Sequence, residues 1–147
     1  MKHRPVLLVE DDENDILLFQ IAARKAGMTR ELVIVRDGVE AFDYLAGKNK
    51  YANRAAHPLP CVMFLDLKIP GKSGLEVLAA MQSLHNLLGL VTIVMTGSGM
   101  EADIEAAYAL GANSYLVKQS DPEKFITVLE LIDQYWLRAN IFPPSAG

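Results

Sequence analysis

The fold is decided by one stretch of the chain, Val62-Met63-Phe64-Leu65-Asp66-Leu67-Lys68-Ile69-Pro70-Gly71. Its apolar residues run directly into a carboxylate, and a Pro-Gly pair that favours a turn follows. An apolar run of this length, bounded by turn residues, is typical of a strand buried on both faces in a parallel sheet. Open parallel sheets bind ligands at the carboxyl ends of their strands. Asp66 is therefore expected at such an edge, as a nucleophile, a metal ligand or an ordinary turn residue.

Further strands and helices alternate on both sides of this stretch. Strands are expected at 5–9, 32–35, 90–95 and 114–117. Helix starts are expected at Asn14 or Asp15, Val39, Ser73 or Gly74, Glu101 and Asp121-Pro122. This alternation predicts an α/β fold, a flavodoxin-like three-layer α/β/α sandwich with five helices and a five-stranded parallel sheet in the order 2-1-3-4-5.

Some details of these elements can also be predicted. The first helix is expected to bury one side, formed by Ile16, Phe19, Ile21, Ala22, Ala23 and Ala26. Residues 48–60 are expected to form the longest loop, on the surface. The last helix is expected to continue to about Asn140, before Pro143-Pro144.

Length and composition exclude several classes of protein. The chain has 147 residues, which suit one domain with a sound core. A net charge of −4 gives no basic surface for nucleic acid, and no apolar run is long enough to cross a bilayer. One cysteine, Cys61, suits a reducing cytoplasm. We expect one cytoplasmic, mildly acidic domain at 1–140 with a tail at 141–147, and no direct contact with nucleic acid or membrane.

Polar residues follow four of the five predicted strands: Glu10-Asp11-Asp12, Asp66, Thr96 and Lys118. Carboxylates that meet at one edge repel each other unless a cation joins them, and Mg²⁺ suits such hard ligands. An Asp beside Mg²⁺ can attack a phosphoryl donor to give an acyl phosphate. Lys118 could then pair with one phosphoryl oxygen, and the Thr96 hydroxyl could donate to another. The alternative is that these residues are ordinary caps and turns at strand ends.

The combined pattern resembles the signature of receiver domains of two-component response regulators. The matching residues are Glu10-Asp11, Asp66 with Pro70 and Gly74, Thr96, and Lys118. The spacings of 30 residues from Asp66 to Thr96 and 22 from Thr96 to Lys118 are also typical of that family. The resemblance covers about residues 4–140. It departs after Lys118, where Gln119 stands in place of the usual proline, so a different loop shape is open here.

The resemblance implies a role for each of these residues. Asp66 would be the phospho-acceptor, and Asp11 would bind Mg²⁺ together with Asp66 and the backbone carbonyl of Lys68. Glu10 would act through metal-bound water. Lys118 would pair with the phosphoryl group, Thr96 would be the switch hydroxyl, and Tyr115 would change its exposure when Thr96 moves.

A narrower resemblance concerns the partners. The loop at 48–60 and the ending Tyr135-Trp136-Leu137 … Ile141-Phe142-Pro143-Pro144 look like the small regulators paired with bacterial and cyanobacterial phytochromes. This implies a phosphorelay signalling protein rather than an enzyme, without a DNA-binding output. Its partners would be a sensor histidine kinase of the phytochrome type and a histidine phosphotransfer protein.

The last helix predicts a self-association surface. Phe125, Leu129, Ile132 and Trp136 form one apolar stripe that the sheet should bury. A second stripe, Val128, Leu131 and Tyr135, either packs on neighbouring helices or contacts a partner. Because the tail is also apolar, we expect a homodimer through the fourth and fifth helices, the fifth strand and the tail.

Two other functions use similar folds. An aspartate-nucleophile phosphatase of the haloacid dehalogenase type would resemble Asp-x-Asp at the nucleophile, whereas Asp66 is followed by Leu67-Lys68. A flavin-binding electron carrier would need small polar residues after the first strand, where this chain has acids that repel phosphate.

Overall fold

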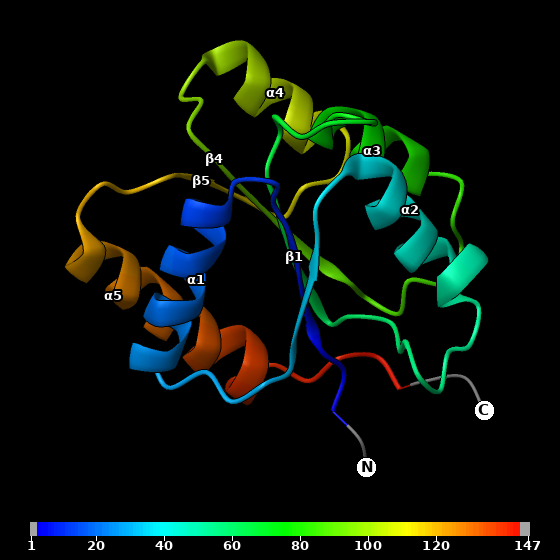
Figure 1. The fold of residues 1–147 in the computed structure, drawn as a ribbon, viewed down its shortest axis with the longest axis horizontal. Helices are drawn as coiled ribbons and strands as arrows, with labels where there is room; N and C mark the ends of the chain where they lie inside the picture. Colours follow the sequence, from blue (N-terminus) through cyan, green and yellow to red (C-terminus); the bar gives the residue numbers. More distant parts are fainter. Residues whose placement is uncertain (1–2, 145–147) are drawn as a thin grey trace.

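The protein is built on a central sheet of five parallel strands (Figure 1). The structure is a computed structural model and describes residues 3–144. The strands are β1 Val6–Val9, β2 Leu32–Val35, β3 Val62–Leu65, β4 Val91–Thr96 and β5 Ser114–Val117. They lie in the order β2-β1-β3-β4-β5, which confirms the predicted topology. Since β1 pairs with both β2 and β3, the direction of strand order reverses between β1 and β3, where ligands bind in such sheets.

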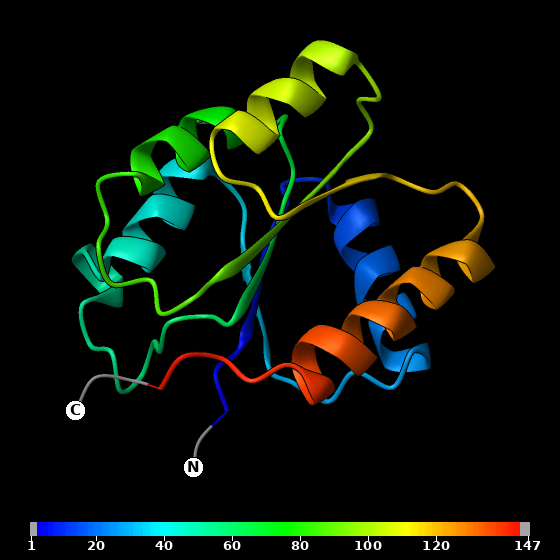
Figure 2. The same ribbon diagram turned by 180° about the vertical axis from the view of Figure 1, so that it is seen from behind.

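Five α-helices cover the two faces of this sheet. They are α1 Glu13–Lys25, α2 Gly38–Ala46, α3 Gly74–Met81, α4 Glu101–Ala109 and α5 Pro122–Ile132. Helices α1 and α5 pack together on one face, and α2, α3 and α4 cover the other (Figures 1 and 2). This is the predicted three-layer sandwich. Within residues 3–144, none of the helices combines the length and the apolar character that crossing a membrane requires.

The sheet separates two apolar cores. Leu7 and Val9 of β1 face α2, α3 and α4, whereas Leu8 faces Phe19 of α1 and Leu129 of α5. This alternation follows from the two-residue period of a strand. All residues of β1, β3 and β4 are buried, but the edge strands β2 and β5 keep partly exposed residues.

Helix α1 begins earlier than predicted. Asp12 is its N-cap, and the Asp12 side chain accepts a hydrogen bond from the Asp15 backbone N–H at 3.0 Å. The prediction that Asn14 or Asp15 caps this helix was therefore wrong. An N-cap side chain accepts from a backbone N–H two or three residues later, and Asp12 does so with Asp15. Ile21 was also wrongly placed on the buried side, since it is 37% exposed.

The last helix changes its geometry partway along. After Ile132 the α-helix continues as a π-helix, η2 Asp133–Ala139, which ends at Asn140 as predicted. Asp133 is buried there and accepts a hydrogen bond from Arg138 Nε at 2.8 Å. The predicted inner stripe does face the sheet: Leu129 is fully buried, and Phe125, Ile132 and Trp136 pack around it. In the second stripe, Leu131 and Tyr135 are exposed.

The segment at 48–60 is more ordered than a surface loop. It contains the short 3₁₀ helix η1, Asn49–Tyr51, and Tyr51 is buried with its hydroxyl bonded to Glu40. Tyr51 also packs against Tyr44, with ring centroids 4.8 Å apart. Arg54 donates hydrogen bonds to carbonyl oxygens at the end of α2. The segment therefore packs against the C-terminal end of α2 and satisfies carbonyl groups there.

Part of the predicted tail packs on the domain itself. The guanidinium of Arg4 lies 5.6 Å from the centroid of the Phe142 ring. Pro143 fills the space beside Gly89, where a Cβ atom would lie 2.6 Å from the proline ring. Ile141 is 91% exposed. The tail was predicted over 141–147, and its last three residues lie outside the described residues.

Candidate phosphoryl-acceptor and metal site

Backbone hydrogen bonds place the polar residues at the carboxyl edge of the sheet. The Glu10 N–H donates to Val35 O at 3.0 Å, and the Asp66 N–H donates to Val9 O at 3.1 Å. The Lys118 N–H donates to the carbonyl oxygen of Thr96 at 2.8 Å. Each residue thus continues the parallel ladder just beyond its strand. The register of the strands, rather than a flexible loop, fixes the positions of these side chains.

Lys118 lies at the centre of the site. Its ammonium group donates to Asp15 Oδ2 at 2.7 Å, to Glu10 Oε1 at 2.8 Å and to Asp66 Oδ2 at 2.9 Å. The second oxygen of Asp66 accepts a hydrogen bond from the backbone N–H of Lys68 at 3.2 Å. The carboxylate of Asp66 is therefore held in one orientation from two sides.

A glycine, Gly74, allows the start of α3 to pack closely against the backbone of Asp66. A Cβ atom on Gly74 would lie 2.4 Å from the carbonyl oxygen of Asp66 and 2.7 Å from Leu67 Cα. Gly74 also donates its N–H to Leu67 O at 2.9 Å. Ser73 caps this helix in a capping box with Glu76. The start of α3 and the segment after Asp66 thus form one close-packed unit.

Burial and charge shift the pKa values of the site in different directions. Burial raises the pKa of Glu10, which is 2% exposed, and the neighbouring Asp66 raises it further. Burial would also raise the pKa of Asp66, but its hydrogen bonds to Glu10 and Lys118 outweigh this and lower it. Burial would lower the pKa of Lys118, but its bonds to Asp15, Glu10 and Asp66 raise it overall. Lys118 is thus a cation with carboxylates around it.

The acidic residues fit a divalent cation. Among residues 3–144, Glu10, Asp11 and Asp66 each offer an oxygen, and these atoms all lie within 4.8 Å of one another. Glu10 Oε2 is buried and has no hydrogen-bond partner in that part of the chain. An unpaired buried oxygen in a group of carboxylates is costly unless a cation or proton satisfies it. Hard carboxylate ligands of this kind suit Mg²⁺ or a similar metal.

Within residues 3–144, Thr96 and Tyr115 make no side-chain hydrogen bond to the carboxylates. Thr96 is 1% exposed, and its hydroxyl has no hydrogen-bond partner among the described residues. Tyr115 is half-buried, and its hydroxyl donates to the carbonyl oxygen of Ser98 at 2.8 Å. The Ser98 hydroxyl in turn bonds to Asp103 of α4. The tyrosine is therefore tied to the loop after Thr96.

The structure brings most of the predicted site residues together. Glu10, Asp11, Asp66 and Lys118 meet, whereas Tyr115 bonds to a neighbouring loop. Lys68 was predicted to act through its backbone carbonyl; its backbone N–H bonds to Asp66, and its side chain is exposed. The Lys118–Gln119 peptide bond is trans, as are all others in the described chain.

Asp15 is a site residue that was not predicted from the sequence, because its place near a helix start was interpreted only as that of a cap. With Asp12 as the cap, Asp15 falls at the third position of the helix, within the first turn beside the strand ends. The three-residue spacing from Asp12 to Asp15 was therefore the sequence signal that could have placed Asp15 near the site.

A parallel sheet with an acidic cluster, a threonine and a lysine at its carboxyl edge defines a phosphoryl-accepting signalling domain of the receiver type. The family model described as the response regulator receiver domain matches residues 6–130. The chain belongs to this family. The family does not favour the phosphatase alternative.

Several relatives that are about one third identical to this chain are single-domain response regulators. Response regulator Rcp1 from Synechocystis sp. (strain PCC 6803) is 34% identical over 140 residues, which are 95% of this chain and 93% of Rcp1. The crystal structure of the phosphorylated cyanobacterial phytochrome response regulator RcpA has a TM-score of 0.86 and 35% identity, covering 97% of this chain and all of RcpA. The Mn²⁺-bound form of Rcp1 has a TM-score of 0.83 and 33% identity, covering 96% of this chain and 99% of that one.

Proposed function

We propose that this protein is a phospho-accepting response regulator in which Asp66 takes a phosphoryl group from a sensor histidine kinase. The observation that carries the proposal is the carboxylate of Asp66, which Lys118 and the Lys68 N–H orient at the switch point of the sheet. One Asp66 oxygen attacks phosphorus, and the P–N bond of the phosphohistidine breaks. The electron pair of that bond goes to the imidazole nitrogen, which takes up a proton. The product is an acyl phosphate on Asp66.

The metal in this proposal is Mg²⁺. Asp11, Asp66 and the backbone carbonyl of Lys68 would hold it directly, and Glu10 would hold it through water. A magnesium ion bound there supplies positive charge to phosphoryl oxygens as negative charge builds up during transfer. The support in this chain is the carboxylate cluster with the unpaired Glu10 Oε2. Lys118 would pair with another phosphoryl oxygen as a point charge.

Thr96 and Tyr115 form the proposed switch. The buried hydroxyl of Thr96 has no hydrogen-bond partner within residues 3–144, so it can donate to a phosphoryl oxygen without breaking an existing hydrogen bond. Movement of Thr96 toward Asp66 would carry the following loop with it, including the Ser98 carbonyl that holds Tyr115. Tyr115 could then turn inward and change the surface formed by α4, β5 and α5.

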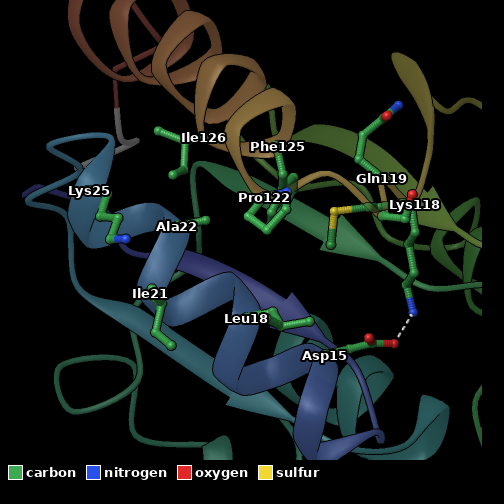
Figure 3. Close-up of a pocket in the computed structure, with 12 residues that line it drawn as sticks. Asp15, Leu18, Ile21, Ala22, Lys25, Lys118, Gln119, Pro122, Phe125 and Ile126 are labelled. Carbon is green, nitrogen blue, oxygen red and sulfur yellow. Dashed lines mark hydrogen bonds and ion pairs between the residues drawn. The ribbon is translucent and has the colours of Figure 1, made fainter.

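The kinase would dock beside the acceptor residue. An apolar groove between α1 and α5 opens next to Lys118, and its lining includes Leu18, Ile21, Phe125 and Ile126 (Figure 3). A helical surface of a kinase or of a histidine phosphotransfer protein could bury these side chains while presenting its phosphohistidine to Asp66. The relatives whose names include phytochrome or bacteriophytochrome support a phytochrome-type kinase, and hence light as the input. The single cysteine, Cys61, supports a location in the cytoplasm.

The output would pass through protein contact. The face of α4, β5, α5 and the following η2 exposes Tyr108, Val117, Leu131 and Tyr135, which supports a homodimer through that face. The domain would comprise residues 1–140, and the tail at 141–147 would extend the contact through the exposed Ile141. No basic surface for nucleic acid is implied by the net charge of −4.

The test is the mass of the intact protein after incubation with acetyl phosphate and Mg²⁺. The proposal expects one added phosphoryl group, as the P–O bond breaks and acetate leaves. The adduct should be absent in Asp66→Asn and in the presence of a chelator. An adduct that persists in Asp66→Asn would place the acceptor elsewhere. Sustained turnover of generic phosphate esters would instead favour the phosphatase.

A further inference from the structure

Asp15 accepts the shortest of the hydrogen bonds that Lys118 donates to side chains. The distances from Lys118 Nζ are 2.7 Å to Asp15, 2.8 Å to Glu10 and 2.9 Å to Asp66. A lysine ammonium has three N–H groups, so these bonds use all of its donors. Lys118 can therefore bind a phosphoryl oxygen only when one of its carboxylate partners gives way.

These three carboxylates differ in what phosphoryl transfer does to them. One oxygen of Asp66 becomes the bridging oxygen of an acyl phosphate, so a phosphoryl oxygen takes its place as an acceptor for Lys118. Glu10 belongs to the cluster that fits a divalent cation, so a bound cation competes with Lys118 for it. Asp15 lies outside that cluster and does not accept the phosphoryl group. Its bond to Lys118 is the one that transfer leaves unchanged.

Within residues 3–144, Lys118 is the one hydrogen-bond donor to the Asp15 carboxylate. Asp12 supplies the cap of α1, and Asp15 contributes only its backbone N–H to that cap. Glu13, the other acid in the first turn, pairs with Arg36 at 2.8 Å on the exposed side of the helix. The Asp15 side chain instead points across the end of the α1–α5 groove to Lys118 (Figure 3).

We propose that Asp15 is a positioning residue for phosphoryl transfer, which anchors the Lys118 ammonium while the bonds to Glu10 and Asp66 are exchanged. This rests on the proposed function of Asp66 as acceptor. A lysine side chain is long and flexible, so an anchored ammonium loses less freedom when it binds the phosphoryl oxygens. The anchor also holds Lys118 near Asp66 once the attraction of the free carboxylate is gone.

The test compares Asp15→Asn, which keeps the shape of the side chain, with Asp15→Glu and with the control Glu13→Gln. The initial rate of phosphorylation by acetyl phosphate at saturating Mg²⁺ should fall about 3- to 10-fold in Asp15→Asn, as expected for a partly exposed charge-assisted hydrogen bond. Asp15→Glu should recover part of the rate, and Glu13→Gln should match the unmodified protein. Mg²⁺ affinity should stay within about twofold in all variants, because a single screened charge outside the metal cluster has little effect.

Nitrogen-15 NMR of the Lys118 ammonium tests directly whether Asp15 holds this group by a hydrogen bond. Its N–H signal should be protected from exchange with water in the unmodified protein and in Glu13→Gln, and lost in Asp15→Asn. An unchanged phosphorylation rate in Asp15→Asn, or a persisting ammonium signal, overturns the proposal. If Asp15→Asn does not fold, Asp15→Ser replaces it, and its phosphorylation rate and ammonium signal are compared with those of the unmodified protein and of Glu13→Gln. A protein that accepts no phosphoryl group at all would refute the function of Asp66, whereas the NMR comparison would still decide whether Asp15 anchors Lys118.

Discussion

Replacing Gly74 by alanine should displace the backbone of Asp66, although Gly74 contributes no side chain to the site. The added Cβ would lie 2.4 Å from the Asp66 carbonyl oxygen, whereas ordinary contact begins near 3.4 Å. The start of α3 and the segment after β3 must therefore separate by about 1 Å, since the three nearest neighbours of the Cβ are all backbone atoms. Overpacking of this kind costs about 1–3 kcal/mol. For a domain of this size, a loss of about 2 kcal/mol lowers Tm by roughly 4–8 °C.

The same shift should slow phosphorylation. A displacement of about 1 Å at a reacting group can reduce a rate by roughly 100-fold. The assay pairs thermal unfolding with the rate of adduct formation from acetyl phosphate. Gly99→Ala is a matched control for stability, because its Cβ would lie 3.8 Å from Val117 Cγ2 in an ordinary contact. If Gly74→Ala unfolded within about 0.5 kcal/mol of the parent and accepted phosphate at the same rate, the close approach of α3 would not matter, and this reasoning would be wrong.

The remaining predictions concern the switch, the metal and pH. Thr96→Ala should still accept a phosphoryl group but should lose the phosphorylation-dependent change in partner affinity, measured by titration; a retained change would refute the switch role. Mg²⁺ at 100 times its Kd should stabilise the protein by about 2.7 kcal/mol, and Asp11→Asn should lose most of this gain in thermal unfolding. Burial raises the pKa of Tyr44 to about 12 in the folded protein, above the usual value of 10.0. Stability from this group is therefore complete below about pH 10 and is lost as pH rises toward 12, by roughly 2 kcal/mol. In Tyr44→Phe this part of the pH dependence should vanish from denaturant titrations, at the cost of the hydrogen bond to Pro58 O; an unchanged slope would contradict the assignment.

The fold was predictable because its signals are local and repeated. Strands such as Val62–Leu65 are short apolar runs that end at turn residues, and each is followed by a helix with a recognisable start. Once the order of the strands follows from this alternation, the meeting of Glu10, Asp66 and Lys118 at one edge follows as well. The hydrophobic period and the topology were therefore sufficient to predict the fold and the meeting of these three residues.

Three features depend on contacts between distant residues and were not predictable from local patterns. Asp15 reads as a helix cap in the sequence, and only the position of Lys118, 103 residues later, shows its other contact. The π-helix after Ile132 has no local breaker, and it occurs where Asp133 is buried and paired with Arg138. The burial of Tyr51 depends on its bond to Glu40 of the preceding helix.

The position of β5 at the edge of the sheet affects how the molecule opens in solution. Lys118 and Tyr115 lie on or next to a strand that pairs on one side only, with β4, whereas Asp66 follows a strand that is buried between two neighbours. Elements with fewer buried contacts open at lower free energy than the centre of a domain. Amide protons of β5 should therefore exchange with deuterium through local fluctuations, while those of β1 and β3 wait for global unfolding. The fold thus places Lys118 and Tyr115 at an edge of the sheet, where local opening is easier, and Asp66 after a central strand.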